Sequence, residues 1–376
     1  MAIAALSLGT PIVSAEELID TPSLVVDEGL LHTNIAEMAG MAKTYGVNLR
    51  PHIKTHKTPE IAKLQIANGA IGITCAKLGE AEVMADAGID DILIAYPFFG
   101  EIKTQRLLAV MEKARIIVSV DSFEAAERIS AAMSKHDRSI EVYIEVNTGQ
   151  DRSGLRWGAE AEALAVDVAR KPGLRLAGIF SHEGHANTQA PEDIEAVAIE
   201  AGHRIVETAE AIRSHGIEVP AVSIGSTPAS SYTPTVPGIT EMRPGTYVFR
   251  DTTGFRYGVY GPDRCAARFL ATVVSHPAPD RCILDTGSKT LALDPSKGHP
   301  GYGYIIGHPG AIIDRLSEEH AVVVIPEDDP GFTIGDRVEV IPNHVCPTVN
   351  LADELVIVRD GHVIDTWKIA ARGKNK

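Results

Sequence analysis

The chain has 376 residues, of which 44% are hydrophobic and 23% charged, and its formal net charge is −15. These values are ordinary for a folded globular protein, and no segment reaches the roughly 18 consecutive apolar residues of a membrane-spanning helix. The acidic balance and the absence of long basic runs argue against a nucleic-acid-binding surface and favour a small-molecule partner.

The first 14 residues are apolar, but they lack a cationic start and are interrupted by Gly9 and Pro11. A secretory signal is therefore not expected, and the sequence predicts a cytoplasmic protein. The four cysteines are widely spaced and form no CxxC pair, so free thiols are expected. They are Cys75, Cys265, Cys282 and Cys346.

Short β-branched runs alternate with longer helical patterns from residue 23 to about residue 250, as in repeated βα units with a parallel sheet. Eight runs are expected strands: Ser23 to Val26, Val47 to Arg50, Ile71 to Thr74, Asp91 to Ala95, Arg115 to Val120, Glu141 to Val146, Leu176 to Ser181 and Ala221 to Ile224. Amphipathic stretches are expected helices: Pro59 to Ala67, Glu80 to Ala87, Ala159 to Ala169 and Asp193 to Ser214. Eight such units predict a closed (β/α)8 TIM barrel. An open doubly wound sheet is the alternative, but no GxGxxG turn supports it.

Beyond Tyr247 the pattern changes to strands without long helices between them. Extended segments are expected at Arg268 to Ser275, Arg281 to Leu284, Ala311 to Leu316, Ala321 to Ile325, Asp336 to Ile341, Glu354 to Arg359 and His362 to Ile369. The last two flank Asp360-Gly361, a dipeptide typical of two-residue hairpins. We predict a barrel domain over residues 20–250 and an antiparallel β domain over residues 251–376, together with residues 1–19. The end of the chain, residues 373–376, is expected to fray.

The stretch Arg50-Pro51-His52-Ile53-Lys54-Thr55-His56-Lys57 places two lysines and two histidines after one expected strand. A lysine among cationic groups in a poorly hydrated pocket has its neutral amine favoured and can form a Schiff base. Taken alone, the stretch fits a basic surface turn better than a reactive lysine.

Other polar groups follow other expected strands. In a barrel, reactive groups lie on the loops after the carboxyl ends of the strands. Lys54 follows the second expected strand, the loop from Asn147 to Arg152 the sixth, and His182-Glu183-Gly184-His185 the seventh. The turn Gly225-Ser226-Thr227 follows the eighth, and small hydroxyl-bearing turns suit a phosphate group. A lysine and a phosphate-binding turn at one end of a barrel predict pyridoxal phosphate, although each signal alone also fits a simple turn or a surface ion pair.

A second cluster, Asn343-His344-Val345-Cys346-Pro347-Thr348-Val349-Asn350, lies in the β domain. If the segment is extended, His344 and Cys346 point to the same side because they are two residues apart. Imidazole and thiolate ligands favour Zn2+ over Mg2+, and two protein ligands leave positions open for catalysis. A buried cysteine beside a hydrogen-bonded histidine is the alternative.

Five motifs together resemble the D-threonine aldolase and D-serine dehydratase family. They are Arg-Pro-His-x-Lys-x-His-Lys at 50–57, Asp-Arg-Ser-Gly at 151–154, Gly-Ser-Thr-Pro at 225–228, Arg-Pro-Gly-Thr-Tyr at 243–247 and His-x-Cys-Pro-Thr at 344–348. The resemblance extends from about Asp20 to Gly373. It implies a fold-type III pyridoxal-phosphate enzyme of the alanine racemase type, with a barrel, a C-terminal β domain and a divalent metal, here Zn2+ or Mn2+.

The resemblance also implies roles for single residues. Lys54 is expected to form the Schiff base with the cofactor, and Arg152 is expected beside the pyridine ring. Tyr247 is expected to line the cofactor pocket. The phosphate is expected at Gly225, Ser226 and Thr227, and the metal at His344 and Cys346.

The catalytic base is less defined. His182 and His185 are both candidates, because these two positions vary within the family. A homodimer is expected, since sites of this fold type are usually completed by a second subunit.

A lysine, pyridoxal phosphate and a metal together suit a D-3-hydroxy amino acid as substrate. Loss of the hydroxyl proton leads to retro-aldol cleavage into glycine and an aldehyde, whereas loss of the Cα proton leads to dehydration and then to a keto acid and ammonia. Arg-Pro-Gly-Thr-Tyr and the closing Ile-Ala-Ala-Arg-Gly resemble the aldolase branch. Cys346, where family aldolases often carry aspartate, and Gly-Ser-Thr-Pro resemble the dehydratases.

We therefore predict a D-threonine aldolase-type lyase. A D-serine or D-3-hydroxyaspartate dehydratase is the alternative. An amino-acid racemase is less favoured because racemases of this fold need no metal. A non-catalytic pyridoxal-phosphate carrier is less favoured because the small carriers lack a C-terminal β domain.

Overall fold

A computed structural model describes residues 9–256, 258–295 and 300–376, which form two compact units. The barrel unit comprises Glu37–Lys54, Pro59–Gly245 and Lys374–Lys376. The β unit comprises the described residues up to Ala36 together with Thr55–Thr58 and Thr246–Gly373. Helix α1 (Glu28–Tyr45) begins in the β unit and ends in the barrel unit.

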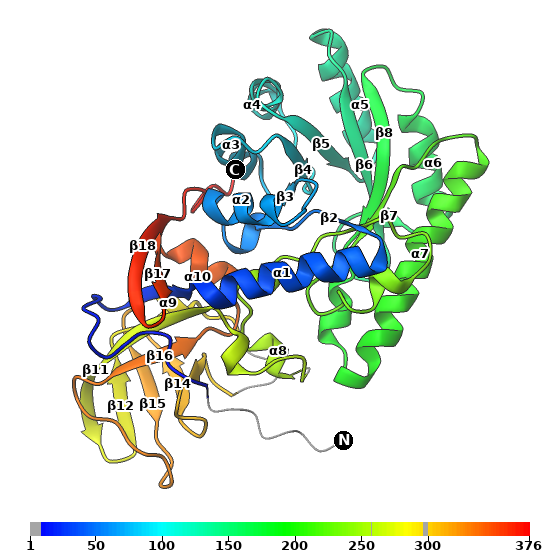
Figure 1. Ribbon diagram of the computed structural model, residues 1–376. Helices are drawn as coiled ribbons and strands as arrows, with labels where there is room; N and C mark the ends of the chain where they lie inside the picture. The colour runs from blue at the N-terminus through cyan, green and yellow to red at the C-terminus, as the bar shows by residue number, and fades with distance from the viewer. Residues whose placement is uncertain (1–8, 257, 296–299) are drawn as a thin grey trace. The chain divides into compact units, whose positions relative to one another are not determined.

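The barrel unit is built on a parallel sheet (Figure 1). Its strands are β2 (Asn48–Leu49), β3 (Ile73–Cys75), β4 (Asp91–Ile94), β5 (Arg115–Val120), β6 (Ile140–Asn147), β7 (Leu155–Arg156), β8 (Leu174–Ser181), β9 (Ala221–Ile224) and β10 (Glu241–Met242). Along the sheet the order is β2-β10-β9-β8-β6-β5-β4-β3, with β7 paired to β6 at the side. A parallel bridge between His52 and Thr74 joins the two ends of this order, so the sheet closes and the predicted barrel is confirmed.

Helices cover the outside of this sheet (Figure 1). They are α2 (Pro59–Ala67), α3 (Leu78–Asp86), α4 (Glu101–Met111), α5 (Phe123–Lys135), α6 (Ala159–Val168) and α7 (Ile194–Ser214). Helix α5 illustrates why they form where they do. The Ser122 hydroxyl caps it by accepting from the backbone N–H of Ala125 at 3.2 Å, and its buried residues repeat at three- and four-residue spacing. Inside the barrel, the strands contribute a buried cluster of Leu93, Ile117, Tyr143, Ala177 and Phe180.

The expected first barrel strand was wrong. Residues 23–26 form most of β1 (Ser23–Asp27), which pairs antiparallel with β11 (Ala267–Ala278) and parallel with β17 (Glu354–Arg359) in the β unit. A buried β-branched run followed by a helix has the same sequence pattern in either setting. The eighth barrel strand is β10, whose two residues are too few to give a periodic signal.

The β unit carries a second nine-stranded sheet, in which β1 pairs parallel with β17 and antiparallel with β11. Its other strands are β12 (Arg281–Leu284), β13 (Tyr304–Ile305), β14 (Ile312–Leu316), β15 (Ala321–Val324), β16 (Arg337–Ile341) and β18 (His362–Lys368), and its helices are α8 (Thr253–Arg256), α9 (Ser288–Leu291) and α10 (Val345–Leu351). The β17–β18 hairpin turns at Asp360-Gly361 as predicted, and both residues have the positive φ, 51° and 87°, that such a turn requires.

A buried ion pair fastens the early residues to this sheet. Arg268 and Glu339 lie 2.8 Å apart, with side chains 1% and 3% exposed. Glu339 also accepts from the backbone N–H groups of Ile12 and Val13 at 2.7 and 2.8 Å.

The last residue of the chain is also held in place, because the Lys376 carbonyl accepts from the Gly79 N–H at 2.9 Å in the barrel unit. The expectation that residues 373–376 fray is therefore wrong for the last residue.

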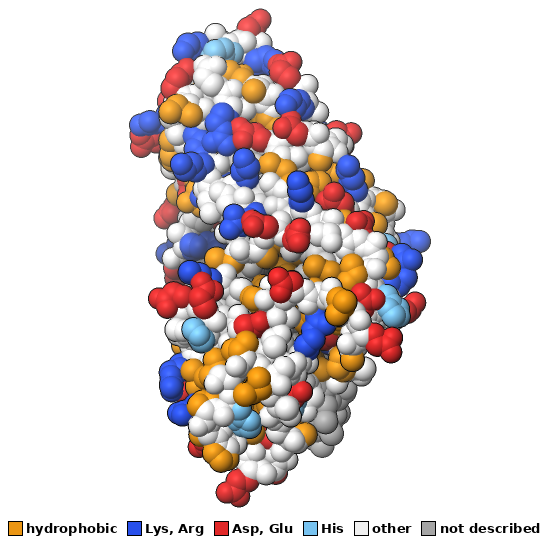
Figure 2. Space-filling view, turned by 90° about the vertical axis from the view of Figure 1, so that its left-hand side faces the viewer, with side chains coloured by type: hydrophobic (Ala, Val, Ile, Leu, Met, Phe, Trp, Pro, Cys, Tyr) orange, Lys and Arg blue, Asp and Glu red, His pale blue; other side chains and the backbone are white. Residues whose placement is uncertain are grey.

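Across the described ranges, no helix combines the length and hydropathy needed to cross a lipid bilayer. Basic side chains are interspersed with acidic ones over the face shown in Figure 2.

Candidate active site

The loop after β2 places Lys54 at the carboxyl end of the barrel. Lys54 lies in a short 3₁₀ turn, Ile53–Thr55, whose two other residues are fully buried. The backbone N–H of Lys54 donates to Nδ1 of His52 at 3.4 Å. Lys57, the other lysine of the motif, has a φ of 53°, is 6% exposed and belongs to the β unit.

Two histidines share the electrostatic environment of Lys54. His182 directly follows β8, and burial, reinforced by the charges of Lys54, Arg152 and Arg243, lowers its pKa to about 3. Burial and the same three cations hold the pKa of His52 well below its usual value. The structure therefore brings Lys54, His182 and Arg152 together, as the sequence predicts, and both imidazoles are neutral near pH 7 and able to accept a proton.

Arg152 directly follows a hydrogen-bonded turn after β6. Oδ1 of the Asn147 side chain accepts from the backbone N–H groups of Gly149 at 2.9 Å and Asp151 at 3.2 Å. The amide of Asn147 in turn donates to the Asp151 carboxylate at 2.8 Å. These bonds fix the turn, so the Arg152 backbone has a defined position although its side chain is exposed.

His185 lies in a different cluster from His182. It is part of a 3₁₀ turn, Gly184–Thr188, and the largest effects on its pKa are burial and the charge of Arg204, which lower it. Arg204, on α7, also donates to the carbonyl of Thr148 at 2.7 Å. The charges that act on His182 are those of Lys54, Arg152 and Arg243, so the structure separates the environments of the two histidines.

The turn after β9 is shaped for a close approach of other groups. Gly225 has a φ of +153°, and a Cβ there would lie 2.8 Å from the backbone nitrogen of Arg243. Ser226 is 6% exposed, and its N–H donates to Oε1 of Glu183 at 2.6 Å. The Ser226 hydroxyl lies near Glu183 but makes no hydrogen bond of normal geometry, and the same is true of Oε2 of Glu183. Thr227, half-buried, completes the turn.

In the β unit, His344 and Cys346 come together, but not on an extended segment. Helix α10 begins at Val345, and only His344, at its N-cap, has extended backbone (φ −143°, ψ 105°). That prediction was wrong because Pro347 suits the first turn of a helix as well as a strand edge. Burial lowers the pKa of His344, but a hydrogen bond to Cys346 and that residue's charge raise it more, to about 9.

Polar groups of the β unit hold these two side chains. Nδ1 of His344 lies 2.5 Å from Oδ2 of Asp294, and Sγ of Cys346 lies 3.2 Å from the hydroxyl of Thr55. Tyr247, at a 3₁₀ turn of the same unit, is 2% exposed. Among the described residues, no group of three or more His, Cys, Asp or Glu side chains is arranged to hold a metal ion.

Two family models match most of the chain. Residues 26–253 match the N-terminal domain of alanine racemase, and residues 266–358 match a putative serine dehydratase domain. D-threonine aldolase from Arthrobacter sp. is 36% identical over 364 residues, covering 94% of this chain and 93% of that protein. The chain belongs to the D-threonine aldolase and D-serine dehydratase family.

Solved structures of this family superpose closely on the chain. The crystal structure of D-threonine aldolase from Filomicrobium marinum has a TM-score of 0.89 at 34% identity, covering 95% of this chain and 97% of that one. A variant of D-threo-3-hydroxyaspartate dehydratase, in its metal-free form, has a TM-score of 0.87 at 32% identity, with coverages of 93% and 97%. These relatives are aldolases and dehydratases, which are two kinds of lyase.

Pyridoxal phosphate is the cofactor of this family, and the barrel unit fits it. Glycine at position 225 lets the turn pack closely against the backbone of Arg243, and the buried hydroxyl of Ser226 is a donor that a phosphate oxygen can satisfy. The Ser226 N–H already donates to Glu183, so it is the hydroxyl rather than this N–H that suits the phosphate. Lys54 lies at the same end of the barrel, after β2.

In the β unit, His344 and Cys346 offer an imidazole and a thiol, which are donor types that divalent metals take, and the described residues add no third ligand. Nδ1 of His344 is engaged by Asp294, and carboxylate–histidine pairs of this kind orient metal-binding imidazoles. The sulfur of Cys346 is the second donor. Two protein ligands leave the remaining positions for water or substrate.

Sequence reasoning missed two barrel residues at this site. Arg243 begins the motif Arg-Pro-Gly-Thr-Tyr, in which the sequence predicts a role for Tyr247 alone. Glu183 stands between the two candidate histidines in the sequence. Their burial, 5% and 0% exposed, is what marks them, because a buried charge requires a partner or a function.

Proposed function

We propose that this chain is a pyridoxal-phosphate- and metal-dependent lyase of the D-threonine aldolase type, which cleaves D-3-hydroxy amino acids into glycine and an aldehyde. One observation carries the proposal: Lys54 shares the carboxyl end of the barrel with two neutral histidines and with the turn at Gly225 and Ser226. A cytoplasmic homodimer remains a prediction, which light scattering and cell fractionation test.

Several barrel residues would hold the cofactor. Lys54 would bind it covalently, and Arg152 would lie beside its ring. The phosphate would be held by Gly225, Ser226 and Thr227. When bound, pyridoxal phosphate draws electrons from the Cα of an amino acid, which is the chemistry that both cleavage and dehydration need.

His182 is the base that we propose for cleavage. Its imidazole is neutral because burial and three nearby cations lower its pKa to about 3, so a ring nitrogen can take the proton of the 3-hydroxyl. A pKa this low makes it a weak base, and an anionic ligand that offsets the cations would strengthen it. His185, beside Arg204, is kept as the second candidate.

His344 and Cys346 would hold the metal, Zn2+ or Mn2+. A bound metal would act as a Lewis acid on the 3-hydroxyl of the substrate. The existence of a metal-free form of the related dehydratase supports a metal in this family.

Dehydration to a keto acid and ammonia is the second candidate. The match of residues 266–358 to a putative serine dehydratase domain favours it, and this range contains Cys346. In this reaction Nζ of Lys54 would take the Cα proton, and a metal held by His344 and Cys346 would supply a Lewis acid for the departing hydroxide. A thiolate suits Zn2+ and a carboxylate suits Mn2+ or Mg2+, so we expect Cys346→Asp to shift the metal preference and the ratio of the two reactions.

Product analysis decides between the two. The purified protein, loaded with pyridoxal phosphate and with Zn2+ or Mn2+, is incubated with D-threonine, D-serine and D-threo-3-hydroxyaspartate. Glycine together with an aldehyde supports the aldolase. A keto acid together with ammonia supports the dehydratase. If none of the three substrates gives either set of products, both proposals are contradicted.

A further inference from the structure

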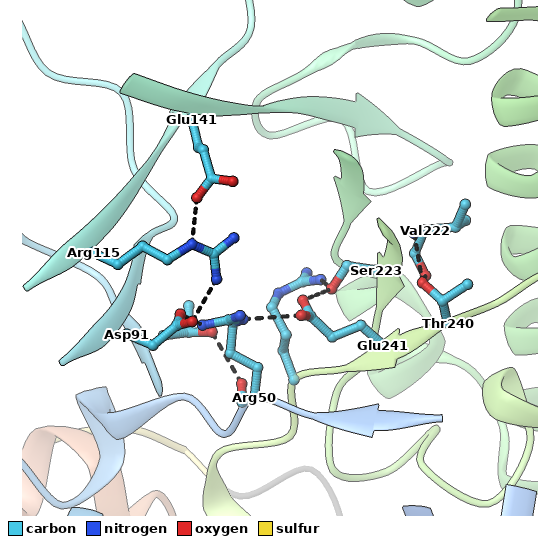
Figure 3. Close-up of polar contacts among 10 residues, drawn as sticks. Arg50, Asp91, Arg115, Glu141, Val222, Ser223, Thr240 and Glu241 are labelled. Atoms are coloured by element: carbon cyan, nitrogen blue, oxygen red, sulfur yellow. Dashed lines mark hydrogen bonds and ion pairs between the residues drawn. The ribbon is translucent and has the colours of Figure 1, made fainter. Parts of the chain in front are cut away.

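The interior of the barrel carries a chain of buried charges where barrels usually pack branched apolar residues (Figure 3). Arg50, 1% exposed, lies between two carboxylates: its Nε donates to Oε2 of Glu241 at 2.9 Å, and it also pairs with Asp91. The chain continues at the amino end of the strands, where Arg115 bonds Asp91 and Glu141, each at 2.5 Å.

Glu241 also faces the opposite direction, toward the candidate site. Its Oε1 accepts from the hydroxyl of Ser223 at 2.5 Å, and Ser223 stands opposite it in the register of β9 and β10. The Ser223 hydroxyl in turn accepts from Nη1 of Arg243. Nη2 of Arg243 donates to the carbonyl of Ser181 at 2.5 Å, directly before His182. Three hydrogen bonds in sequence thus connect Glu241 to the carbonyl of Ser181, the residue that precedes His182.

The placement of Arg243 is demanding. Its side chain is long and flexible, it is only 5% exposed, and a buried guanidinium is costly unless its donors are satisfied. The ring of Phe180 lies 4.9 Å from its guanidinium carbon and supplies one face of the pocket. The Ser223 hydroxyl and the Ser181 carbonyl accept from two different nitrogens of Arg243, and together they fix the orientation of the planar guanidinium.

We propose that Glu241, acting through Ser223, is a positioning residue that fixes the Arg243 guanidinium against the Ser181 carbonyl, at the end of the barrel where Lys54 and His182 lie. This inference rests on the proposed function where it is tested by enzyme activity. The absorption band of the bound cofactor tests it independently of that activity. Arg243 is one of the three cations that act on both His52 and His182, so a displaced guanidinium changes the field in which the cofactor and the base work.

Ser223→Ala tests the link without removing a charge. Glu241 stays paired with Arg50 in this variant, whereas Arg243 loses one of its two fixed acceptors. Glu141→Gln is the matched control, because it perturbs the same chain of charges at its outer end, where Arg115 is 48% exposed. A merely structural network predicts similar behaviour of the two variants.

The measurements are the absorption band of the bound cofactor, kcat and KM for D-threonine, and the melting temperature of the holoenzyme. We expect Ser223→Ala to shift the band and to lower kcat about tenfold or more with a much smaller change in KM, since small misplacements of site groups have effects of this size. We expect Glu141→Gln to keep the band and to keep kcat within about twofold.

The outcomes separate this inference from the proposed function. If the cofactor absorption band and kcat are unchanged in Ser223→Ala, the positioning role of Glu241 is overturned, but the proposed lyase function is not contradicted. A wild-type protein that binds the cofactor but cleaves nothing contradicts the lyase, and the band alone then tests the positioning role. If Ser223→Ala does not fold, Glu241→Asp keeps the charge but shortens the reach to Ser223, and the same band shift and loss of kcat are expected. Their absence in Glu241→Asp overturns the inference.

Discussion

Replacing Glu241 by glutamine should destabilise the barrel unit strongly. The Glu241 side chain is 2% exposed and accepts from Nε of Arg50 at 2.9 Å and from the hydroxyl of Ser223 at 2.5 Å. Glutamine has nearly the same shape, so Glu241→Gln removes a charge while leaving the packing almost unchanged. Two buried arginines, Arg50 and Arg243, then lose their shared counter-charge.

The magnitude follows from burial. At a separation of about 4 Å, two opposite charges attract by about 4 kcal/mol when the effective dielectric constant is about 20. Breaking a buried pair by removing one partner costs about 3–5 kcal/mol. Asp91 still pairs with Arg50, which keeps the loss near the lower limit, about 3 kcal/mol. For a unit of this size the melting temperature should fall by about 6–12 °C.

Thermal and urea unfolding of both proteins near pH 7 measure the effect. Glu124→Gln on helix α5 is the matched control, since Glu124 pairs with Arg128 in the same way but the two side chains are 72% and 59% exposed. Exposed pairs contribute little, so the control should stay within about 0.5 kcal/mol of the wild type. If Glu241→Gln loses no more free energy of unfolding than Glu124→Gln, burial does not strengthen the Arg50 pair and the reasoning above is refuted.

Three further predictions address the candidate site. Lys54→Ala should lose the covalent cofactor, and borohydride reduction with peptide mapping checks this, since a label on Lys57 would contradict the assignment. Chelators should stop turnover while the absorption band of the cofactor persists. The variant His344→Ala should behave like the chelated enzyme. Full activity of a metal-free preparation would show that the metal is not needed. Burial and nearby cations lower the pKa of His182 from its ordinary 6.5 to about 3 in the fold. Below pH 6.5 the unfolded chain therefore binds a proton that the native chain does not, and stability falls as the pH drops toward 3. His182→Gln should therefore lose less stability than the wild type between about pH 7 and about pH 5, and equal changes in the urea midpoint would contradict this.

The barrel could be predicted because its pattern is repeated. Each long strand has a buried β-branched run and is followed by an amphipathic helix, so seven of the eight expected strands lie in the parallel sheet. The misassigned run at residues 23–26 shows the limit of this reasoning. The hydrophobic periodicity of a segment shows that it is buried, but it does not show with which strands the segment pairs. Strand β1 pairs with β11 and β17 of the β unit and not with barrel strands.

The candidate site was predictable where it depends on position along the chain and not where it depends on side-chain direction. Lys54 and His182 follow strands whose carboxyl ends meet, so their proximity could be inferred from the fold. The different environments of His182 and His185 could not be inferred, because the 3₁₀ turn Gly184–Thr188 brings the second side chain near Arg204. Arg243 was hidden for a similar reason, since only the structure shows that it points into the barrel toward Ser223 and Ser181.

The charge of the candidate site differs from that of the chain as a whole. The formal net charge is −15, yet Lys54, Arg152 and Arg243 act together on the two neutral histidines of the barrel end. Burial raises the pKa of Glu183, so this buried carboxylate, which acts on Arg243, offsets these cations only in part. Such a site favours an anion, and an anion that offsets the three cations must raise the pKa of both histidines. His182 therefore becomes a stronger base only when the site is filled, which couples proton transfer to the presence of the ligand.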